Sequence, residues 1–233
     1  MVRYSDCIGR TTMNSYDLIA RFYEHIIDDV LYAIYLDLIE KYTHPSTALE
    51  IGCGTATLSR DLARKGYHMT AMDISESMLE IASYYAGTEK LDIQFLHQDA
   101  VEKIPQGFDL IVLPTDVINH LKNEEDVYRL ANNIYQSLNT QGYLIFDTLH
   151  CDYLETLNGY QETIYFEGHE IIWSAKKIAP CTIEHQIYVE DDLATHIEKS
   201  YKEAFYKDVF KHFNVIALIP LEERTIWVIK KEN

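Results

Sequence analysis

The turn at residues 49–57, LEIGCGTAT, places a carboxylate and two glycines at the end of an apolar run. Glycine lets a ligand approach the backbone closely, and amide groups at the start of a helix carry partial positive charge. Thr57 stands where a dinucleotide fingerprint needs its third glycine, and no Gly-Lys-Ser/Thr follows, so that fingerprint and a phosphate-binding P-loop are both excluded. Glu50, Gly52 and Gly54 therefore predict a different ligand site.

Acidic residues follow two of the next predicted strands. Asp73 closes residues 67–72, and Asp99 follows residues 91–97. One carboxylate can accept hydrogen bonds from two neighbouring hydroxyl groups. Asp73 is therefore a candidate for binding two vicinal hydroxyls of a ligand, the alternative being a surface acid at a strand end.

The elements that must position these residues alternate along the chain. Apolar runs at residues 47–51, 67–72, 91–97, 108–113 and 142–149 predict strands, and amphipathic segments between them predict helices. Ser75 and Asn123 are expected to cap two of these helices, and Gly87 is expected to end the first of the two. This alternation predicts parallel strands with right-handed crossovers, in a doubly wound α/β sheet.

Residues 151–200 differ in character, with β-like runs separated by short breaks. They predict a small inserted antiparallel β-sheet. Residues 202–213 predict a helix, and residues 215–220 and 224–231 predict two last strands that return to the main sheet. Residues 15–41 have a helical pattern. The expected organisation is an N-terminal helical lid (1–46), a main domain (47–150 and 201–233) and the inserted subdomain (151–200).

Residues 48–82 resemble the first motif and following acidic strand end of class I S-adenosylmethionine-dependent methyltransferases. The family pattern of an acid followed by three spaced glycines is matched by Glu50, Gly52 and Gly54, while Ala56 replaces the last glycine. The resemblance extends over residues 15–150, with the last two strands matching less closely. It implies a Rossmann-like sheet whose last strand is antiparallel. The whole layout of the chain is similar to that of a bacterial small-molecule subgroup that includes glycine N-methyltransferase-like enzymes.

The resemblance implies S-adenosyl-L-methionine as the cofactor. Asp73 would bind the ribose and Asp99 would lie near the adenine amino group, while the methyl group of Ala56 narrows the space beside the cofactor. Cys53 has no neighbouring base, and its thiol is expected to fill space. The expected cofactor-binding residues are Tyr16, Tyr23, Glu50, Gly52, Cys53, Gly54, Asp73, Ile74, Met78, Asp99, Ala100, Thr115 and Asn119.

Tyr16 and Tyr23 match paired tyrosines that close over the methionine end of the cofactor in the subgroup. Residues seven apart on a helix share a face, so both can equally belong to a core stripe. Six tyrosines of the later chain could line an acceptor pocket, or could follow β propensity alone. They are Tyr153, Tyr160, Tyr165, Tyr188, Tyr201 and Tyr206.

The loop after residues 108–113 lies at the carboxyl edge of the sheet, where open α/β folds bind ligands. Thr115, Asp116 and Asn119 are in this loop, and His120 follows it. His120 and Asp116 are the candidate catalytic residues, although a lone histidine more often caps a loop. No unmistakable general base is present, which favours catalysis by positioning.

The composition restricts partners and compartment. The 233 residues carry 20 Lys and Arg against 37 Asp and Glu, a net charge of −17, so nucleic acid is an unfavourable partner. No stretch approaches the roughly 18 apolar residues of a membrane span. The four cysteines form no CxxC pair, which argues against a zinc site and a disulfide framework and suits a reducing cytoplasm. No metal is predicted, and the oligomeric state stays open.

The leading hypothesis is N- or O-methylation of a small molecule. The segment LPTDV after the fourth strand lacks the Asn/Asp-Pro-Pro-aromatic and Pro-Cys motifs of nucleic-acid methyltransferases. A tRNA or protein acceptor is the alternative within enzymes. A second alternative is a non-catalytic module that binds S-adenosylmethionine as a sensor.

Overall fold

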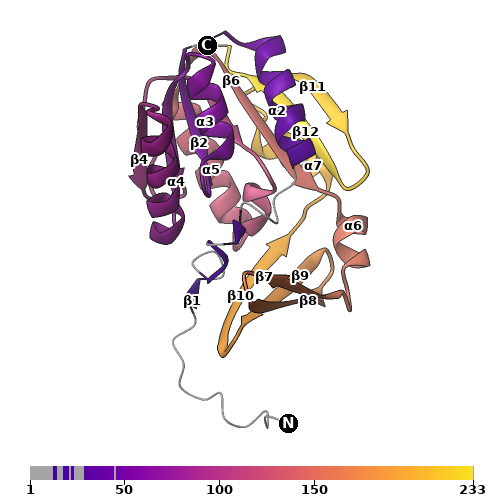
Figure 1. Ribbon diagram of the computed structural model, residues 1–233. Helices are drawn as coiled ribbons and strands as arrows, with labels where there is room; N and C mark the ends of the chain where they lie inside the picture. Colours follow the sequence, from indigo (N-terminus) through magenta and orange to yellow (C-terminus); the bar gives the residue numbers. More distant parts are fainter. Residues whose placement is uncertain (1–12, 15–17, 21, 24–28, 45, 233) are drawn as a thin grey trace.

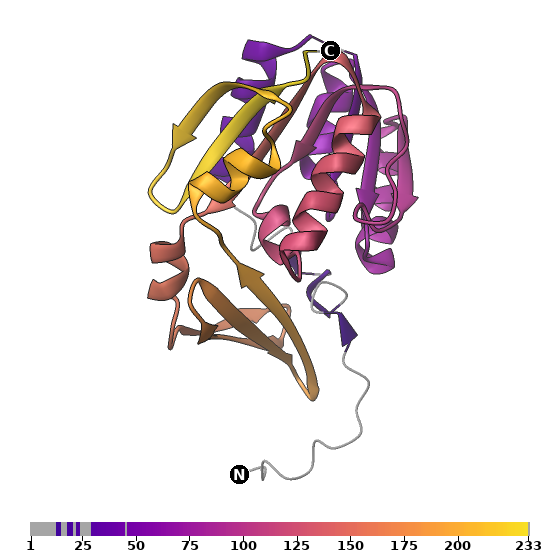
Figure 2. The same cartoon turned by 180° about the vertical axis from the view of Figure 1, so that it is seen from behind.

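The structure is a computed structural model that describes residues 13–14, 18–20, 22–23, 29–44 and 46–232. A large sheet with helices on both faces forms one part of the molecule, and a small sheet lies beside one end of it (Figures 1 and 2). The two sheets contain seven and five strands. This arrangement confirms the predicted Rossmann-like architecture with a separate small antiparallel sheet.

The large sheet has the order β11-β12-β6-β5-β2-β3-β4. Its strands are β2 (Thr47–Ile51), β3 (His68–Asp73), β4 (Ile93–His97), β5 (Phe108–Leu113), β6 (Leu138–Leu149), β11 (Asn214–Pro220) and β12 (Arg224–Lys230). Five strands, from β6 to β4, pair in parallel. β12 pairs antiparallel with β6, as expected for the last strand. The order reverses beside β2, so ligands are expected at the carboxyl ends of β2 and its neighbours.

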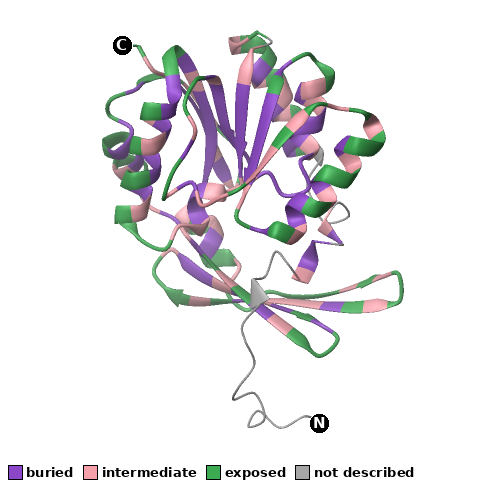
Figure 3. Cartoon of the chain, turned by 90° about the vertical axis from the view of Figure 1, so that its left-hand side faces the viewer, coloured by how far each residue is buried: buried purple, intermediate pink, exposed green. Residues whose placement is uncertain are grey.

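Alternate residues of the buried strands face two helical layers. Leu49 and Ile111 face α5 (Glu124–Ser137) and α7 (Glu203–Val209), whereas Ala48 and Leu110 face α2 (Asp29–Tyr42) and α3 (Thr57–Arg64). Figure 3 shows the buried strands enclosed between these layers. Strands covered on both faces must be apolar on both, which explains the near-continuous apolar runs in the sequence.

Two helices begin at the predicted caps. The Ser75 hydroxyl accepts a hydrogen bond from the Met78 amide at the start of α4 (Glu76–Glu89), and Asn123 does the same for Asp126. The prediction that α4 ends at Gly87 is wrong, because the helix continues to Glu89. Lys90, with φ of 57°, then supplies the left-handed C-cap. α7 is also shorter than the segment 202–213 predicted to be helical.

The small sheet has the order β1-β10-β9-β8-β7. Its strands are β1 (Met13–Asn14), β7 (Gln161–Phe166), β8 (His169–Ala179), β9 (Thr182–Val189) and β10 (Asp192–Lys199). β7 to β10 pair antiparallel, while β1 adds in parallel to β10. Ile19 and Phe22 pack with Ile171 and Ile187 of this sheet. Residues near the N-terminus therefore contact the inserted sheet.

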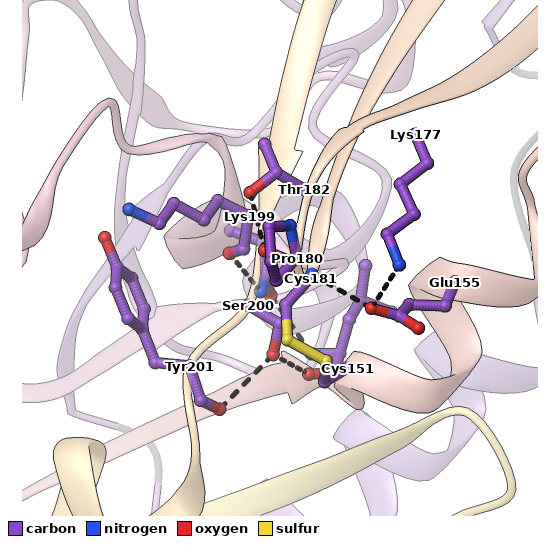
Figure 4. The surroundings of a disulfide bond; sticks show 11 residues. Cys151, Glu155, Lys177, Pro180, Cys181, Thr182, Lys199, Ser200 and Tyr201 are labelled. Atoms are coloured by element: carbon purple, nitrogen blue, oxygen red, sulfur yellow. Dashed lines mark hydrogen bonds and ion pairs between the residues drawn. A yellow bond between two sulfur atoms is a disulfide. The ribbon is translucent and has the colours of Figure 1, made fainter.

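A disulfide joins Cys151 to Cys181 (Figure 4), which corrects the expectation that the cysteines form none. Cys151 begins α6 (Cys151–Thr156), a helix that the sequence reading missed, and Cys181 lies in the turn between β8 and β9. Folding brings their Cα atoms to 4.7 Å although 30 positions separate them in the chain. Sequence spacing alone could not reveal this approach. The other described cysteine, Cys53, is buried and free.

A search of the described residues for membrane-spanning segments finds no helix that is both long and apolar enough to cross a bilayer.

Candidate functional site

The glycine turn links the ends of two neighbouring strands. The amides of Gly52 and Cys53 both donate to the Met72 carbonyl, at 2.8 and 3.0 Å, and the Gly54 amide donates to Asp73 Oδ2 at 2.8 Å. The carboxyl ends of β2 and β3 therefore lie side by side. The Asp73 carboxylate is fixed against the turn, with its Oδ1 accepting from the Ser75 amide at 2.9 Å.

Both glycines of the turn have positive φ and close neighbours. Gly52 has φ of 70°, and a Cβ there would lie 2.5 Å from Val117 Cγ2. Gly54 has φ of 52°, and a Cβ there would lie 3.0 Å from Tyr23 Cε1. A side chain at either position would be strained and would displace a neighbour. These close neighbours account for the two glycines without reference to any ligand. The lack of side chains at both positions also leaves the backbone of the turn uncovered there.

A cavity of about 330 Å³ opens at these strand ends, and we call it the cofactor cavity. It is lined by Ile51, Gly52, Met72, Asp73, Ile74, Gln98, Asp99, Ala100, Val101, Glu102, Val117, His120, Leu121, Lys122, Asp126, Arg129 and Leu130. Five predicted cofactor-binding residues are thus brought together: Gly52, Asp73, Ile74, Asp99 and Ala100. The Ile74 residue is 58% exposed, an apolar surface available to a flat ring.

These residues fit an adenosyl ligand chemically. Each oxygen of Asp73 accepts one backbone hydrogen bond, and a carboxylate oxygen can accept more than one. Asp99 uses Oδ1 to accept from the Val101 amide at 2.8 Å, which orients its carboxylate at the cavity wall. The bare turn at Gly52 completes a site whose lining includes these two carboxylates and an apolar surface. S-adenosylmethionine offers the matching hydroxyl and amino donors.

Glu50 does not line the cofactor cavity. It is fully buried, and the Ser59 hydroxyl donates to its Oε2. Burial raises the pKa of Glu50 to about 8, against the lowering effect of the Ser59 contact. Glu50 therefore remains largely protonated at neutral pH beneath the turn.

Three other residues at the motif are packed in the interior. Cys53 clusters with Ala56 and Leu79, and burial raises the pKa of its thiol well above the usual value. Ala56 has φ of 63°, a left-handed conformation that glycine adopts at least cost, and it is the N-cap residue of α3. It does not line the cofactor cavity. Met78 is buried against Ile19 and Ile171.

The predicted lid tyrosines have different outcomes. Tyr16 lies outside the described residues. The ring of Tyr23 lies against Gly54, and burial, followed by the nearby Asp116, raises the pKa of its hydroxyl. The Thr115 side chain hydrogen-bonds to Tyr23. Tyr23 therefore lies between the glycine turn and the loop after β5.

The loop after β5 has an unusual backbone. Thr115 and Asp116 both have φ of 57°, which is costly for residues other than glycine and especially for β-branched threonine. The Asp116 amide donates to Asp147 Oδ2 at 3.0 Å, and Arg224 Nη1 donates to Asp116 Oδ1 at 3.0 Å. These contacts hold the loop in its strained form, and Asn119 anchors it further by donating to the Lys199 carbonyl at 2.9 Å.

Asp147 and Arg224 form a buried charge cluster that the sequence reading missed. Arg224 Nη1 donates to Asp147 Oδ2 at 2.8 Å, and the Tyr35 hydroxyl donates to Asp147 Oδ1 at 2.5 Å. Burial raises the pKa of Asp147 to about 6, although Arg224 opposes the shift. The signal available in the sequence was an acid within the apolar run GYLIFDTL.

His120 is the last residue of the short 3₁₀ helix η2 (Val117–His120) and faces Asp116, with Nε2 3.3 Å from Asp116 Oδ2. Burial lowers its pKa, but the contacts with Asp116 and Glu198 outweigh this and leave the pKa raised. Its ring centroid lies 5.3 Å from that of His196 in the small sheet. The loop and the small sheet therefore meet at His120.

A second cavity, of about 640 Å³, lies between the two sheets, and we call it the acceptor cavity. Its lining residues are Ile19, Tyr23, Leu31, Thr115, Asp116, Leu149, Tyr153, Leu157, Tyr160, Glu162, Ile164, Trp173, His185, His196, Glu198 and Arg224. Of the tyrosines considered above, Tyr153 and Tyr160 line it, whereas Tyr165 and Tyr188 are exposed and Tyr206 is buried. The sequence reading did not single out His185, His196 or Glu198.

The two cavities share one wall. Thr115 and Asp116 line the acceptor cavity, while Val117 and His120 of the same short segment line the cofactor cavity. Tyr23 lines the acceptor cavity and contacts Gly54 of the glycine turn. The two cavities therefore lie next to each other, on either side of residues 115–120.

Comparisons with known proteins agree with this geometry. Residues 48–142 match the family model described as a methyltransferase domain. A putative methyltransferase of Geobacillus sp. is 28% identical over 184 residues, 74% of each chain. Two solved structures show the same fold. A methyltransferase from Clostridium acetobutylicum has a TM-score of 0.79 at 18% identity, covering 93% of this chain and 97% of its own.

The second structure is the S-adenosylmethionine-bound amino pentose methyltransferase CalS10 from Micromonospora echinaspora. Its TM-score is 0.72 at 15% identity, with 95% of this chain and 99% of that chain covered. The match of residues 48–142 includes the glycine turn, Asp73 and Asp99.

Proposed function

We propose that this chain, a class I S-adenosylmethionine-dependent methyltransferase, methylates a nitrogen or oxygen atom of a small molecule bound in the acceptor cavity. The single observation that carries this proposal is the shared wall of the two cavities. Asp116 lines the acceptor cavity, His120 lines the cofactor cavity, and their side chains lie 3.3 Å apart. The proposed donor and acceptor sites therefore lie side by side.

The proposed reaction is an in-line displacement. A lone pair of the acceptor atom forms a bond to the methyl carbon, the carbon–sulfur bond breaks, and its electrons remain on sulfur. The proton of the acceptor passes to solvent, and S-adenosylhomocysteine is the second product. The chain contributes mainly by holding the reactants aligned in a sheltered site.

The size and lining of the acceptor cavity support a small, polar acceptor. A volume of about 640 Å³ lies within the ordinary range of small-molecule pockets. Tyr153, Tyr160 and Trp173 offer flat surfaces and hydrogen-bonding groups, while Glu162 and Glu198 disfavour an anionic acceptor. The amino pentose specificity of CalS10 supports a polar, uncharged or cationic molecule of this size.

A product assay tests the proposal. The purified chain and S-adenosylmethionine are incubated with a panel of hydroxyl- and amine-bearing metabolites, with tRNA and with protein in parallel, and methylated products are detected by mass spectrometry. We expect turnover with a small acceptor only. Turnover confined to tRNA or protein would contradict the acceptor class. Tight S-adenosylmethionine binding without any turnover would instead support the sensor alternative.

A further inference from the structure

Three histidines surround one buried glutamate where the small sheet meets the cofactor cavity. His196 and Glu198 lie on β10, His185 lies on the paired strand β9, and His120 comes from the loop of the large sheet. The side chains of His196 and Glu198 are 10% and 11% exposed. Burying a carboxylate so deeply is costly unless cationic or hydrogen-bonding groups surround it.

His185 lies between Trp173 and Glu198, and its contacts define its tautomer. The Trp173 indole N–H donates to His185 Nδ1 at 3.0 Å, and indole nitrogen can only donate. The proton of a neutral His185 is therefore on Nε2, which lies 3.2 Å from Glu198 Oε2. His185 thus faces Oε2 of Glu198, while the other oxygen, Oε1, faces His196.

The possible ligand atoms of His120, His196 and Glu198 have the spacing of a metal-ion site. His196 Nε2 lies 3.6 Å from Glu198 Oε1, beyond hydrogen-bonding distance. Two ligands bound at about 2.05 Å to one tetrahedral ion lie about 3.4 Å apart, close to that separation. His120, His196 and Glu198 each offer one such atom, and all three atoms lie within 4.8 Å of one another.

We propose that His120, His196 and Glu198 bind a divalent transition-metal ion, such as Zn²⁺, at the wall between the two cavities. Two imidazoles and one carboxylate are a ligand set suited to such ions, and three protein ligands leave a position open. Asp116, 3.3 Å from His120, adds a second carboxylate that offsets the charge of the ion. The absence of a CxxC pair bears only on zinc bound by cysteines, and none of these three ligands is a cysteine.

The open position faces the acceptor cavity, because His196 and Glu198 both line it. This role rests on the proposed function. An ion held by His120, His196 and Glu198 would act as a Lewis acid that lowers the pKa of an acceptor hydroxyl. The hydroxyl proton would pass to solvent, the oxygen would take up the methyl group, and the sulfur would keep the electrons of the broken carbon–sulfur bond. The metal site therefore favours oxygen-bearing acceptors among the small molecules considered above.

Metal binding is measured directly, so that the test does not depend on knowing the acceptor. The full chain, treated with a chelator and kept free of reductant so that Cys151 and Cys181 stay paired, is titrated with Co²⁺ and Zn²⁺ by calorimetry and by Co²⁺ absorption. We expect one ion per chain. His196→Ala and Glu198→Gln should each weaken binding at least ~100-fold, and Trp173→Phe, which removes the donor to His185, roughly 10-fold.

His169→Ala is the matched control, because His169 forms an exposed ion pair with Glu190 at 2.7 Å on the same sheet but away from the cluster. It should bind metal as the unchanged chain does. S-adenosylhomocysteine affinity, measured for every variant, verifies folding and should be the same throughout. Absence of a saturable metal site, or a site unaffected by His196→Ala and Glu198→Gln, would overturn the proposal. Neither result would bear on methyl transfer to a small molecule.

Discussion

Asp73 has a structural task as well as its proposed contact with the cofactor ribose. Its two oxygens already accept hydrogen bonds from the Gly54 and Ser75 amides, so the carboxylate is held in place before any ligand arrives. Such prior ordering lowers the entropic cost of binding. An asparagine at this position keeps the shape of the side chain but removes its charge and one acceptor oxygen, so it weakens the backbone contact as well as any contact with a ribose.

Asp73→Asn should weaken S-adenosylhomocysteine binding. Each lost charge-assisted hydrogen bond contributes about 1.5–3 kcal/mol, so we expect roughly 10- to 140-fold weaker binding by isothermal calorimetry. Asp92→Asn, an exposed carboxylate ahead of β4, is the matched control and should bind as the unchanged chain does. Equal affinities for the two variants would remove Asp73 from the cofactor site.

Glu50 makes stability depend on pH. The unfolded chain releases the proton of Glu50 near pH 4.5, whereas the folded chain retains it up to about pH 8. The folded state thus binds more protons between these values, and its stability falls as pH rises through the window by about 1.4 kcal/mol per pH unit from this group. Above pH 8 the effect levels off.

Glu50→Gln, which stays neutral, should remove this dependence. Free energies of unfolding are compared between pH 7 and 8, above most of the range in which Asp147, with a pKa of about 6, titrates. The difference between variant and unchanged chain should grow in favour of the variant as pH rises. Glu80→Gln, at an exposed helix position, should show no such trend. A constant difference for Glu50→Gln would contradict the burial of a protonated carboxyl.

At the scale of elements, the disulfide ties α6 to the turn between β8 and β9. α6 supplies Tyr153 to the acceptor cavity, and the Cys181 amide also donates to Glu155 Oε1 at 3.4 Å. Glu155 in turn pairs with Lys177 at 2.8 Å, as Figure 4 shows. The position of α6 over the cavity therefore depends on one covalent and two polar contacts.

Reduction of this disulfide should destabilise the folded chain. A link between residues 30 positions apart in the sequence typically contributes about 2–4 kcal/mol, chiefly by restricting the unfolded state. Dithiothreitol should therefore lower the melting temperature of the unchanged chain. A Cys151→Ser/Cys181→Ser double variant should melt at the lower temperature with or without reductant. A melting temperature unaffected by dithiothreitol would show that the bond is not formed in solution.

Local sequence signals predicted the elements of the large sheet and the residues at its strand ends. The apolar runs gave the strands, and Ser75 and Asn123 marked helix starts through their side-chain hydrogen bonds. The predicted end of α4 at Gly87 was wrong, because a glycine tolerated inside a helix looks the same in sequence as a glycine that ends one. α6 was missed because a helix of six residues offers too little periodicity.

At the scale of the whole molecule, the missed parts depend on contacts between distant segments. His120, His185 and Glu198 come from two sheets, and nothing in their local sequence indicates that they meet. The same holds for Cys151 and Cys181. The sequence could show which residues end the strands of one sheet, but it could not show how the inserted sheet lies against that edge. The acceptor cavity is formed by this placement.

Arg224 joins three segments of the molecule at the edge of the acceptor cavity. It binds Asp116 of the loop after β5 and Asp147 of β6, positions 108 and 77 residues away in the chain. Both carboxylates sit in or near the interior, where loss of the guanidinium leaves their charges uncompensated. The strained backbone at Thr115 and Asp116 also depends on these contacts.

Arg224→Met should therefore destabilise the chain by about 3–5 kcal/mol in denaturant unfolding, because it breaks a buried ion cluster. Arg64→Met, which removes an exposed arginine paired with Asp61 and Glu89, should cost only about 0–1 kcal/mol. Adding Asp147→Asn to Arg224→Met should recover part of the loss, since it removes the charge left unpaired. Equal losses for the two arginine variants, or no recovery in the double variant, would mean that the fold of the loop does not depend on this cluster.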